Sequence, residues 1–428
     1  MPSKKVDSIV SKLLSRERFN SERFKNSLAI FKSFIFKLIV QGIYFIILAR
    51  TFAPERYGAY VGIVAIVSIF MPFATWGSEK VLIQQVSRDR SLFREYWGTS
   101  ILKNLFFGSI CISIILTIYS LIAIPNISIY AVFFVALANL IFLRLNDIAR
   151  DSFLAVGQLS YTGRAIFLVS LNRFFAAVLM IVAFSNPSIL LWTILYCAAT
   201  FLAAVISGWL VIQQIDYPEF RLSKMMTELR LGFSFAIGIS ARSIYNDLDK
   251  SMLAKLSTLE SAGIYGAAYH ILNVAFTPIL SLAMASYRNF FQQGVSGIQG
   301  SFQLCKKLLP SSLGYSLLAI LGLAFGAPFI PIILGAEYSN SAIALVWLSP
   351  TIFFHTMHLF AADTLTGADL QSVRSGTQVV VAMINGVLNF WLIPLYSWHG
   401  AIWATITSEF LLMVLLWGAV YRYSRKSV

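Results

Sequence analysis

Charged residues are scarce in this chain. They make up 12% of its 428 residues, against 58% hydrophobic residues, and the mean hydropathy is +0.74. No polar stretch longer than about 30 residues separates the apolar ones. This composition excludes an ordinary soluble enzyme and leaves no separate soluble domain, so any function must lie inside an apolar helical bundle.

Catalytic and metal-binding motifs are also absent. The three cysteines, Cys111, Cys197 and Cys305, lack C-x-x-C spacing, which argues against a disulfide framework or a metal site and for a packing role. The sequence has no nucleotide-binding G-x-x-x-x-G-K-[ST] loop, no H-E-x-x-H and no G-x-S-x-G. We therefore exclude a single-chain ATP-driven pump and expect no cofactor, no metal and no catalytic residue.

Long apolar stretches are what the chain does contain. Each is long enough to cross a hydrocarbon layer of roughly 30 Å as a helix, which predicts an all-α polytopic membrane protein with about twelve transmembrane helices. Aromatic residues, 14% of the chain, are expected at lipid-facing and interfacial positions, and no aromatic ligand site is predicted. The helices are predicted at residues 28–49, 57–76, 98–123, 130–145, 165–184, 190–212, 231–256, 263–287, 308–330, 342–365, 376–392 and 401–421.

The basic residues predict the orientation in the membrane. The net charge is +14, and Lys and Arg gather in the N-terminal segment and on alternate loops. Because cytoplasmic loops carry an excess of Lys and Arg, these faces and both termini are predicted to be cytoplasmic, and the charge does not indicate nucleic-acid binding. The predicted organisation is a basic cytoplasmic segment (1–27), an N-lobe of helices 1–6 (28–213), a cytoplasmic loop (214–230), a C-lobe of helices 7–12 (231–421) and a cytoplasmic tail (422–428).

A weak internal repeat supports two parallel halves. The segments E-R-Y-G-A-Y (55–60) and E-S-A-G-I-Y (260–265) share Glu, Gly and Tyr at identical offsets, and each follows the first helix of a six-helix set. Transporters built from such repeats commonly bind substrate near the midplane between them. The alternative, that the pattern is only a favourable external turn, stays open at this point.

Seven of the basic residues inside the predicted spans are candidates for a role there, since a charge without a purpose at that depth costs at least about 2.5 to 3.5 kcal/mol. Lys32, Lys103 and Lys255 lie near span ends, so their ammonium groups are expected to extend to the membrane interface. The other four are predicted to line a hydrated cavity and to bind an anionic substrate: Arg242, Lys250, Arg173 and Lys37.

Ionisable groups of the opposite kind are also predicted at depth. In the seventh span Asp247 lies three residues before Lys250, so neutralisation within the helix is an alternative to a polar cavity face. For the polar residues of the other spans, the alternative to a role in the cavity is a hydrogen bond between neighbouring helices. The candidates for a proton or sodium relay, or for polar groups of the cavity, are Asp247, Asp249, Glu409, Asp363 and His270.

Four segments in order resemble a known family. They are A-R-T-F-A-P-E-R-Y-G-A-Y from Ala49, D-L-D-K-S-M-L-A-K-L-S-T-L-E-S-A-G-I-Y from Asp247, F-I-P-I-I-L-G-A-E-Y from Phe329 and L-N-F-W-L-I-P-L-Y-S-W-H-G-A-I-W-A-T from Leu388. Together they resemble the polysaccharide biosynthesis flippases, the Wzx-type O-antigen or exopolysaccharide translocases of the MOP exporter superfamily. The resemblance spans nearly the whole chain.

The resemblance implies a MATE-like, two-lobed carrier in the bacterial inner membrane. Its cargo would be undecaprenyl-diphosphate-linked oligosaccharide, moved from the cytoplasmic to the periplasmic leaflet by alternating access, with a glycan polymerase and chain-length proteins as further partners. The deep cations suit a diphosphate, since guanidinium and ammonium groups supply charge and hydrogen-bond donors. By this likeness Arg242, Lys250, Arg173 and Lys37 would line the cavity.

Two other functions stay open. An ion-coupled MATE-like exporter of cationic small molecules would be expected to present carboxylates in its cavity, whereas deep bases outnumber deep acids here. A membrane-embedded glycan polymerase or ligase would be an enzyme acting on the same lipid-linked material. Such an enzyme would be expected to need a large external loop, and the longest predicted here has only about ten residues.

Overall fold

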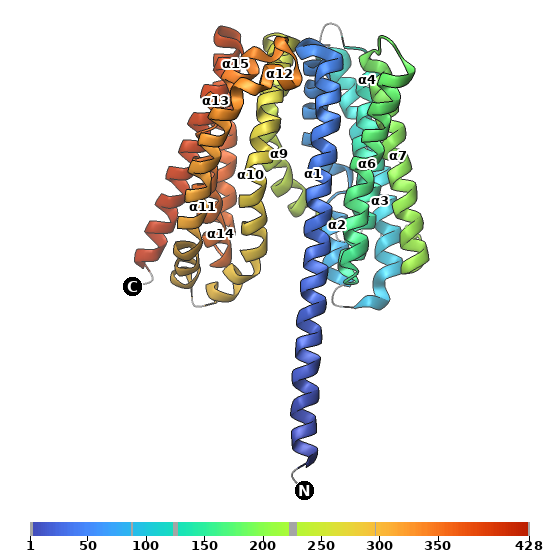
Figure 1. Ribbon diagram of the computed structural model, residues 1–428, viewed down its shortest axis with the longest axis vertical. Coiled ribbons are helices and arrows are strands. Elements are labelled where there is room, and N and C mark those ends of the chain that lie inside the picture. Colours follow the sequence, from blue (N-terminus) through green and yellow to red (C-terminus); the bar gives the residue numbers. More distant parts are fainter. Residues whose placement is uncertain (1–2, 87–88, 123–126, 222–228, 296, 427–428) are drawn as a thin grey trace.

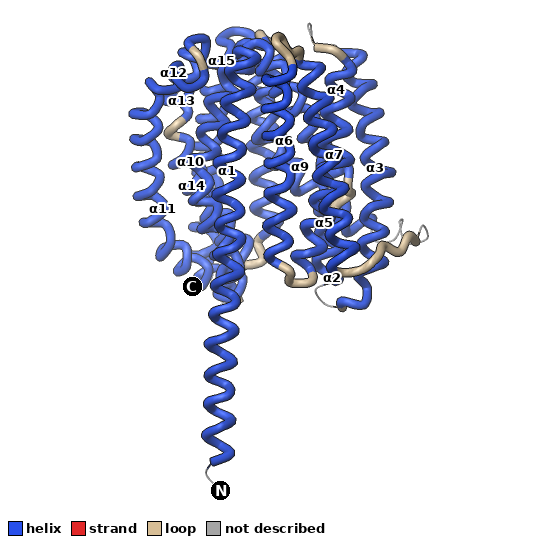
Figure 2. The backbone as a smooth tube through the Cα atoms, turned by 45° about the vertical axis from the view of Figure 1, so that its right-hand side comes forward, coloured by secondary structure: helices blue, strands red, loops and turns tan. Residues whose placement is uncertain are grey.

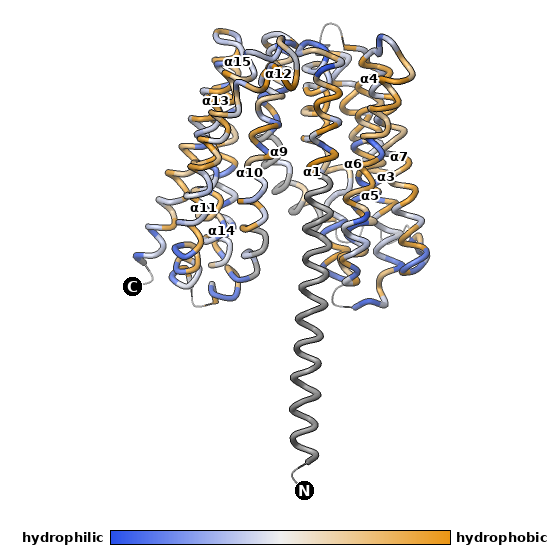
Figure 3. Tube along the Cα trace, in the orientation of Figure 1, coloured by the Kyte–Doolittle hydropathy of each residue, from blue (hydrophilic) through white to orange (hydrophobic). Residues whose placement is uncertain are grey.

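The computed structural model describes residues 3–86, 89–122, 127–221, 229–295 and 297–426. Side chains are described from Leu38 onward, with gaps at 122, within 230–246 and at 284, 285 and 288. Within these ranges every regular element is a helix, as Figure 2 shows. Hydrophobic residues dominate the middle of the helices, and hydrophilic residues gather toward the end that carries the termini (Figure 3).

The first half of the chain forms a group of helices that we call the N-lobe (Figure 1). A short 3₁₀ turn (Arg90–Leu92) precedes α3, and a π-helical segment (Leu137–Phe142) joins α4 to α5. The helices are α1 (Ser3–Ala74), α2 (Ser78–Val86), α3 (Phe93–Ile122), α4 (Ile129–Ala136), α5 (Leu143–Ala155), α6 (Leu159–Ala183) and α7 (Ile189–Gln214).

The second half forms the C-lobe (Figure 1). Two 3₁₀ turns (Ala327–Phe329 and Ala336–Tyr338) flank the short α12, and α13 and α14 are separated by a 45° bend at Pro350. The helices are α9 (Leu229–Leu256), α10 (Leu259–Gly294), α11 (Ile298–Gly326), α12 (Ile330–Leu334), α13 (Ser339–Leu348), α14 (Thr351–Gly367) and α15 (Gln371–Lys426).

Two helices reverse direction at a single non-helical residue. Ala53 in α1 has φ 53° and is followed by Pro54, which disfavours a helical residue before it. Ser397 in α15 has φ 55°, and its hydroxyl lies 2.7 Å from those of Ser257 and Ser261. With these reversals both chain ends lie at the same end of the molecule (Figure 1).

The predicted all-α membrane fold is confirmed, but the count of twelve spans stays a prediction. Eight helices of the described part are long and apolar enough to cross a membrane, or nine if the bent α13–α14 pair is one span. In that count Leu38–Ala74 and Gln371–Arg425 are each one helix, although each contains a reversal. The count does not cover α9, because the side chains of most of its residues between 230 and 246 lie outside the described part of the chain.

The repeated motif marks a contact between the lobes. A Cβ added to Gly58 would lie 1.7 Å from the carbonyl oxygen of Leu259, and one added to Gly263 would lie 1.9 Å from that of Pro54. Each glycine therefore allows the backbone of the other lobe to approach closely, and the contact is reciprocal. The motif is thus an interlobe crossing of α1 and α10 as well as a turn.

Polar groups also stabilise the contact between the lobes near the crossing of α1 and α10, at the end of the molecule opposite the termini. The Arg50 guanidinium donates hydrogen bonds of 2.6 Å to the carbonyl oxygens of Ile332 and Ile333. The Tyr338 hydroxyl donates to the Ala49 carbonyl oxygen at 3.2 Å. Arg50 lies between the first two predicted helices, in a loop predicted to be external, and this contact explains the presence of a basic residue there.

The packing inside each lobe agrees with two further expectations and corrects one. Cys111, Cys197 and Cys305 are free and buried, as predicted. Lys103 is only 4% exposed, so its ammonium group lies within the protein and does not extend to the membrane interface. The prediction from its position near a span end was wrong because neighbouring helices of the N-lobe cover that end of α3.

We predict that Gly58→Ala lowers the free energy of unfolding by about 1 to 3 kcal/mol, the usual cost of overpacking. The added methyl group would overlap the Leu259 carbonyl and force α1 and α10 apart. The measurement is thermal unfolding of the purified protein in detergent. Gly208→Ala in α7 is the control, since nothing lies within 4 Å of its added Cβ. Equal melting temperatures for the two variants would contradict the assigned contact.

Candidate functional site: a cavity between the lobes

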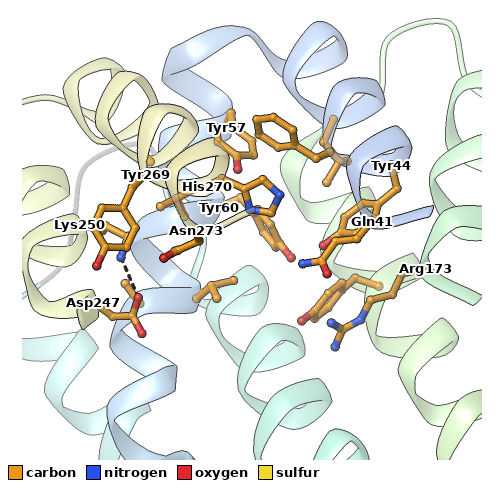
Figure 4. Close-up of a pocket in the computed structure, with 17 residues that line it drawn as sticks. Gln41, Tyr44, Tyr57, Tyr60, Arg173, Asp247, Lys250, Tyr269, His270 and Asn273 are labelled. Carbon is orange, nitrogen blue, oxygen red and sulfur yellow. Dashed lines mark hydrogen bonds and ion pairs between the residues drawn. The ribbon is translucent and has the colours of Figure 1, made fainter. Parts of the chain in front are cut away.

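A cavity of about 280 Å³ lies between the lobes, close to the crossing of α1 and α10. Both lobes contribute to it: α1, α6 and α7 on one side, α9 and α10 on the other (Figure 4). An apolar bundle that surrounds polar groups in this way provides a hydrated site at membrane depth. The polar and aromatic residues that line it are Gln41, Tyr44, Tyr57, Tyr60, Arg173, Tyr196, Asp247, Lys250, Tyr269, His270 and Asn273.

Arg173, one of the four predicted cavity cations, extends from α6 into this cavity (Figure 4). Its Nε donates to the Thr200 hydroxyl at 3.3 Å, its Nη2 donates to Oδ1 of Asn139 at 3.4 Å, and its guanidinium lies 4.2 Å from the centre of the Tyr196 ring. These partners are all neutral, and no described carboxylate forms an ion pair with Arg173. Its guanidinium is therefore held by neutral groups and not by an ion pair with a described carboxylate.

Lys250 also lines the cavity, but its charge is paired. Its Nζ lies 2.7 Å from Oδ1 of Asp247 and 3.8 Å from Oδ1 of Asp249, and it lies over the ring of Tyr269. Asp247 in turn accepts a hydrogen bond from the Ser68 hydroxyl of α1 at 3.1 Å. The intrahelical neutralisation considered for this span therefore occurs, and the pair also joins α9 to the N-lobe.

Of the four predicted cavity cations, the structure brings two together. Lys37 lies on α1 and Arg242 on α9, but their side chains are outside the described residues. Their predicted place in the cavity stays a prediction. Arg173 and Lys250 face the cavity from opposite lobes (Figure 4).

A second cavity of about 260 Å³ continues from the first into the N-lobe, sharing Gln41, Tyr44 and Arg173 with it. Arg144 and Arg150 line it and both pair with Asp147, Arg150 at 2.6 Å. Sequence analysis did not include Arg144 or Arg150 among the site residues. The spacing of three residues between Arg144, Asp147 and Arg150, which places all three on one helix face, was the available signal.

The two cavities have a positive lining. Among the described residues, four basic side chains and two acidic ones line them, Arg173, Lys250, Arg144 and Arg150 against Asp247 and Asp147. Two more carboxylates, Asp249 and Asp151, are buried behind this surface at 3% and 2% exposure. Arg144, Arg150 and Lys250 form ion pairs with these acids, whereas Arg173 forms no ion pair with a described carboxylate.

Five tyrosines surround the central cavity, which sequence analysis did not predict. They are Tyr44, Tyr57, Tyr60, Tyr196 and Tyr269. Tyr60 packs edge-on against Tyr196 at 5.8 Å between ring centres. Together with the Gln41 and Asn273 amides they provide ring faces beside hydrogen-bonding groups. The sequence carries no local signal for this cluster, since its members come from three helices.

The five predicted relay residues do not form one chain. Asp247 and His270 line the central cavity, where His270 stacks on Phe45 at 4.4 Å. Asp249 is buried behind it and accepts a hydrogen bond from the Tyr265 hydroxyl. The remaining two lie in the C-lobe with other partners: Asp363 lies 3.5 Å from Arg374, and Glu409 contacts His355 and His358.

Comparison of the sequence with known families identifies the chain. Residues 24–292 match the family described as polysaccharide biosynthesis protein, which is more than half of the sequence. The chain belongs to this family. No curated protein sequence matches it.

Solved structures with the same fold are transporters of the MOP superfamily. A multidrug resistance MATE family transporter in an inward-facing conformation has a TM-score of 0.74 at 11% identity, covering 92% of this chain and 99% of the other. The lipid II flippase MurJ, in an inward closed conformation, also has a TM-score of 0.74 at 13% identity, covering 92% and 87%. An outward-facing MATE transporter has a TM-score of 0.65 at 12% identity, covering 94% and 96%. At these identities the likeness establishes the fold.

We predict that Lys250→Ala destabilises the protein by about 3 kcal/mol, because it leaves Asp247 and the buried Asp249 without their cation. The double variant Lys250→Ala with Asp247→Asn should recover part of that loss. The measurement is thermal unfolding of the three proteins. Equal melting temperatures for the single and double variants would contradict the assigned ion pair.

Proposed function

We propose that the protein is a flippase that moves undecaprenyl-diphosphate-linked oligosaccharide from the cytoplasmic to the periplasmic leaflet of the bacterial inner membrane. Its product would serve O-antigen or exopolysaccharide assembly, with a glycan polymerase and chain-length proteins acting after it. Membership of a polysaccharide biosynthesis family and the fold of a MOP superfamily transporter support this proposal.

The observation that carries the proposal is the Arg173 guanidinium in the interlobe cavity, which is held by neutral groups. Moving a diphosphate through hydrocarbon requires compensating charge and donors along its path. A guanidinium supplies both and binds phosphate oxygens in a bidentate manner. Arg144 and Arg150 border the adjoining cavity and extend this basic surface within the N-lobe.

The sugar portion would occupy the central cavity. A sugar unit presents hydroxyl groups together with apolar C–H faces, and the tyrosine rings and the Gln41 and Asn273 amides match both features. In this proposal the diphosphate would lie toward Arg173 and the second cavity, and the sugar toward the tyrosines. The neutral character of the amide contacts suits a carrier that must also release its cargo.

Alternating access accounts for the shape of the interface. The lobes touch at the end opposite the termini, through the Gly58 and Gly263 crossing and Arg50. With the termini in the cytoplasm, as the basic loops predict, this is a cytoplasm-facing state. The higher TM-score with an inward-facing MATE transporter than with an outward-facing one agrees with that interpretation.

Proton or sodium coupling, if present, would act through Asp247. It lines the cavity and pairs with Lys250, so a coupling ion bound by Asp247 would compete with the ammonium group. The measurement is flux of lipid-linked oligosaccharide in vesicles with and without an imposed gradient. Equal flux in both conditions would remove Asp247 and the other relay candidates from the transport cycle.

Export of cationic small molecules is the second candidate, because the same fold includes multidrug transporters. The net positive lining of the cavities disfavours it, since like charges in an apolar surrounding repel strongly. A polymerase or ligase is less well supported because the family and the fold are those of transporters.

We predict that Arg173→Ala and Asn139→Asp both abolish surface-glycan assembly in cells that depend on this protein. The first removes the guanidinium, and the second places a carboxylate at the atom that Arg173 already contacts, which cancels the charge at nearly constant shape. Glycan on the cell surface is the measurement, with membrane insertion checked by immunoblot.

Arg164→Ala provides the matched control, because Arg164 is an exposed arginine of the same helix. It should support normal assembly. Normal glycan in the Asn139→Asp variant would contradict a role for the Arg173 charge. Increased sensitivity to cationic drugs on loss of the protein, with unchanged glycan, would favour the exporter.

A further inference from the structure

Two histidines and a glutamate converge inside the C-lobe, away from the arginines of the central cavity. Nδ1 of His355 lies 3.1 Å from one carboxylate oxygen of Glu409, and Nε2 of His358 lies 2.7 Å from the other. The side chains are 20%, 7% and 3% exposed, respectively. This group, which we call the C-lobe triad, joins α14 to α15.

The positions of the two histidines on α14 bring their side chains to the same place. His355 and His358 are three residues apart on α14, so they lie on one face, and their ring centres are 4.5 Å apart. The Phe276 ring of α10 packs against His355 at 4.1 Å. One ligand atom from each of the three residues lies within 4.8 Å of the others. Small side-chain rotations would therefore bring all three to one ion.

The chemistry of the three groups selects a class of ion. Two imidazole nitrogens and one carboxylate oxygen are the ligands of zinc and of neighbouring first-row divalent ions. Sodium, magnesium and calcium prefer oxygen ligands throughout. Both imidazoles contact the same carboxylate, one at each of its oxygens.

A small cavity gives the triad room for a further ligand. It measures about 20 Å³, enough for one water molecule, and His355 and Glu409 line it together with Thr351 and Thr405. Tyr269 and Asn273 line both this cavity and the central one. The two cavities are therefore neighbours, and a water molecule or a threonine hydroxyl could complete the coordination of an ion at the triad.

We propose that His355, His358 and Glu409 bind one divalent ion of the zinc class, which ties α14 to α15 within the C-lobe. The site is separate from the anion-binding residues, so it does not depend on the proposed cargo. Binding would replace the imidazole–carboxylate hydrogen bonds by metal–ligand bonds, and each neutral imidazole would keep its proton on the ring nitrogen that does not face the ion.

The test is titration of the purified, metal-stripped full-length protein in detergent with Zn²⁺. One equivalent should bind and raise the melting temperature, since a ligand that prefers the folded state stabilises it. His358→Gln should weaken Zn²⁺ binding by more than 100-fold. Loss of a residue that only hydrogen-bonds to a metal ligand costs roughly 10–100-fold, and loss of a direct ligand should cost more. Co²⁺ in place of Zn²⁺ should give the visible absorption of a nitrogen-ligated tetrahedral or five-coordinate site in the unsubstituted protein.

His399→Gln is the matched control, because His399 is exposed and stacks on Trp398 outside the triad. It should bind Zn²⁺ as the unsubstituted protein does. If His358→Gln does not fold, Glu409→Gln provides the same comparison with its hydrogen-bonding shape retained. Absence of binding, or equal binding by the triad variants and His399→Gln, would overturn the proposal, the latter because it reveals surface binding only.

Discussion

The central constraint on this protein is the cost of a positive charge inside an apolar bundle. Most of its deep charges meet that cost by pairing: Lys250 with Asp247, Arg150 with Asp147 and Asp151, and Arg374 with Asp363. Arg173 is satisfied differently, by a hydroxyl, an amide oxygen and a tyrosine ring. Neutral partners orient the guanidinium without cancelling its charge, which leaves the interlobe cavity able to attract an anion.

The lobes can surround that cavity because their backbones approach closely on one side of it. Gly58 and Gly263 occupy equivalent positions in the two repeats and each meets the other lobe's backbone. The same segment carries Tyr57 and Tyr60 into the cavity. A change in the crossing of α1 and α10 would therefore alter both the closure of the lobes and the tyrosine surface of the site. This coupling is what a carrier with alternating access requires.

Much of the fold could be predicted from the sequence because hydrophobic length and charge asymmetry act locally. The apolar runs gave the helices, and the repeated Glu, Gly and Tyr pointed to the two lobes. Two of the predicted deep cations, Arg173 and Lys250, line the central cavity. The sequence left open whether Asp247 neutralises Lys250, because the spacing of three residues allows the pair without requiring it. The tyrosine cluster depends on contacts between helices, for which a single sequence holds no local signal. For Arg144 and for the two histidines of the C-lobe triad the three-residue spacing was a signal, but it does not show which cavity or which partner helix they meet.

The most direct test of the account compares the binding of short polyprenyl lipids to the purified protein. Farnesyl diphosphate, farnesyl monophosphate and farnesol share a tail and differ only in charge. If the cavity recognises a diphosphate, affinity should fall in that order, and the affinity for farnesyl diphosphate should decrease with added salt and with loss of the Arg173 charge. Equal affinity for farnesol and farnesyl diphosphate would contradict the account.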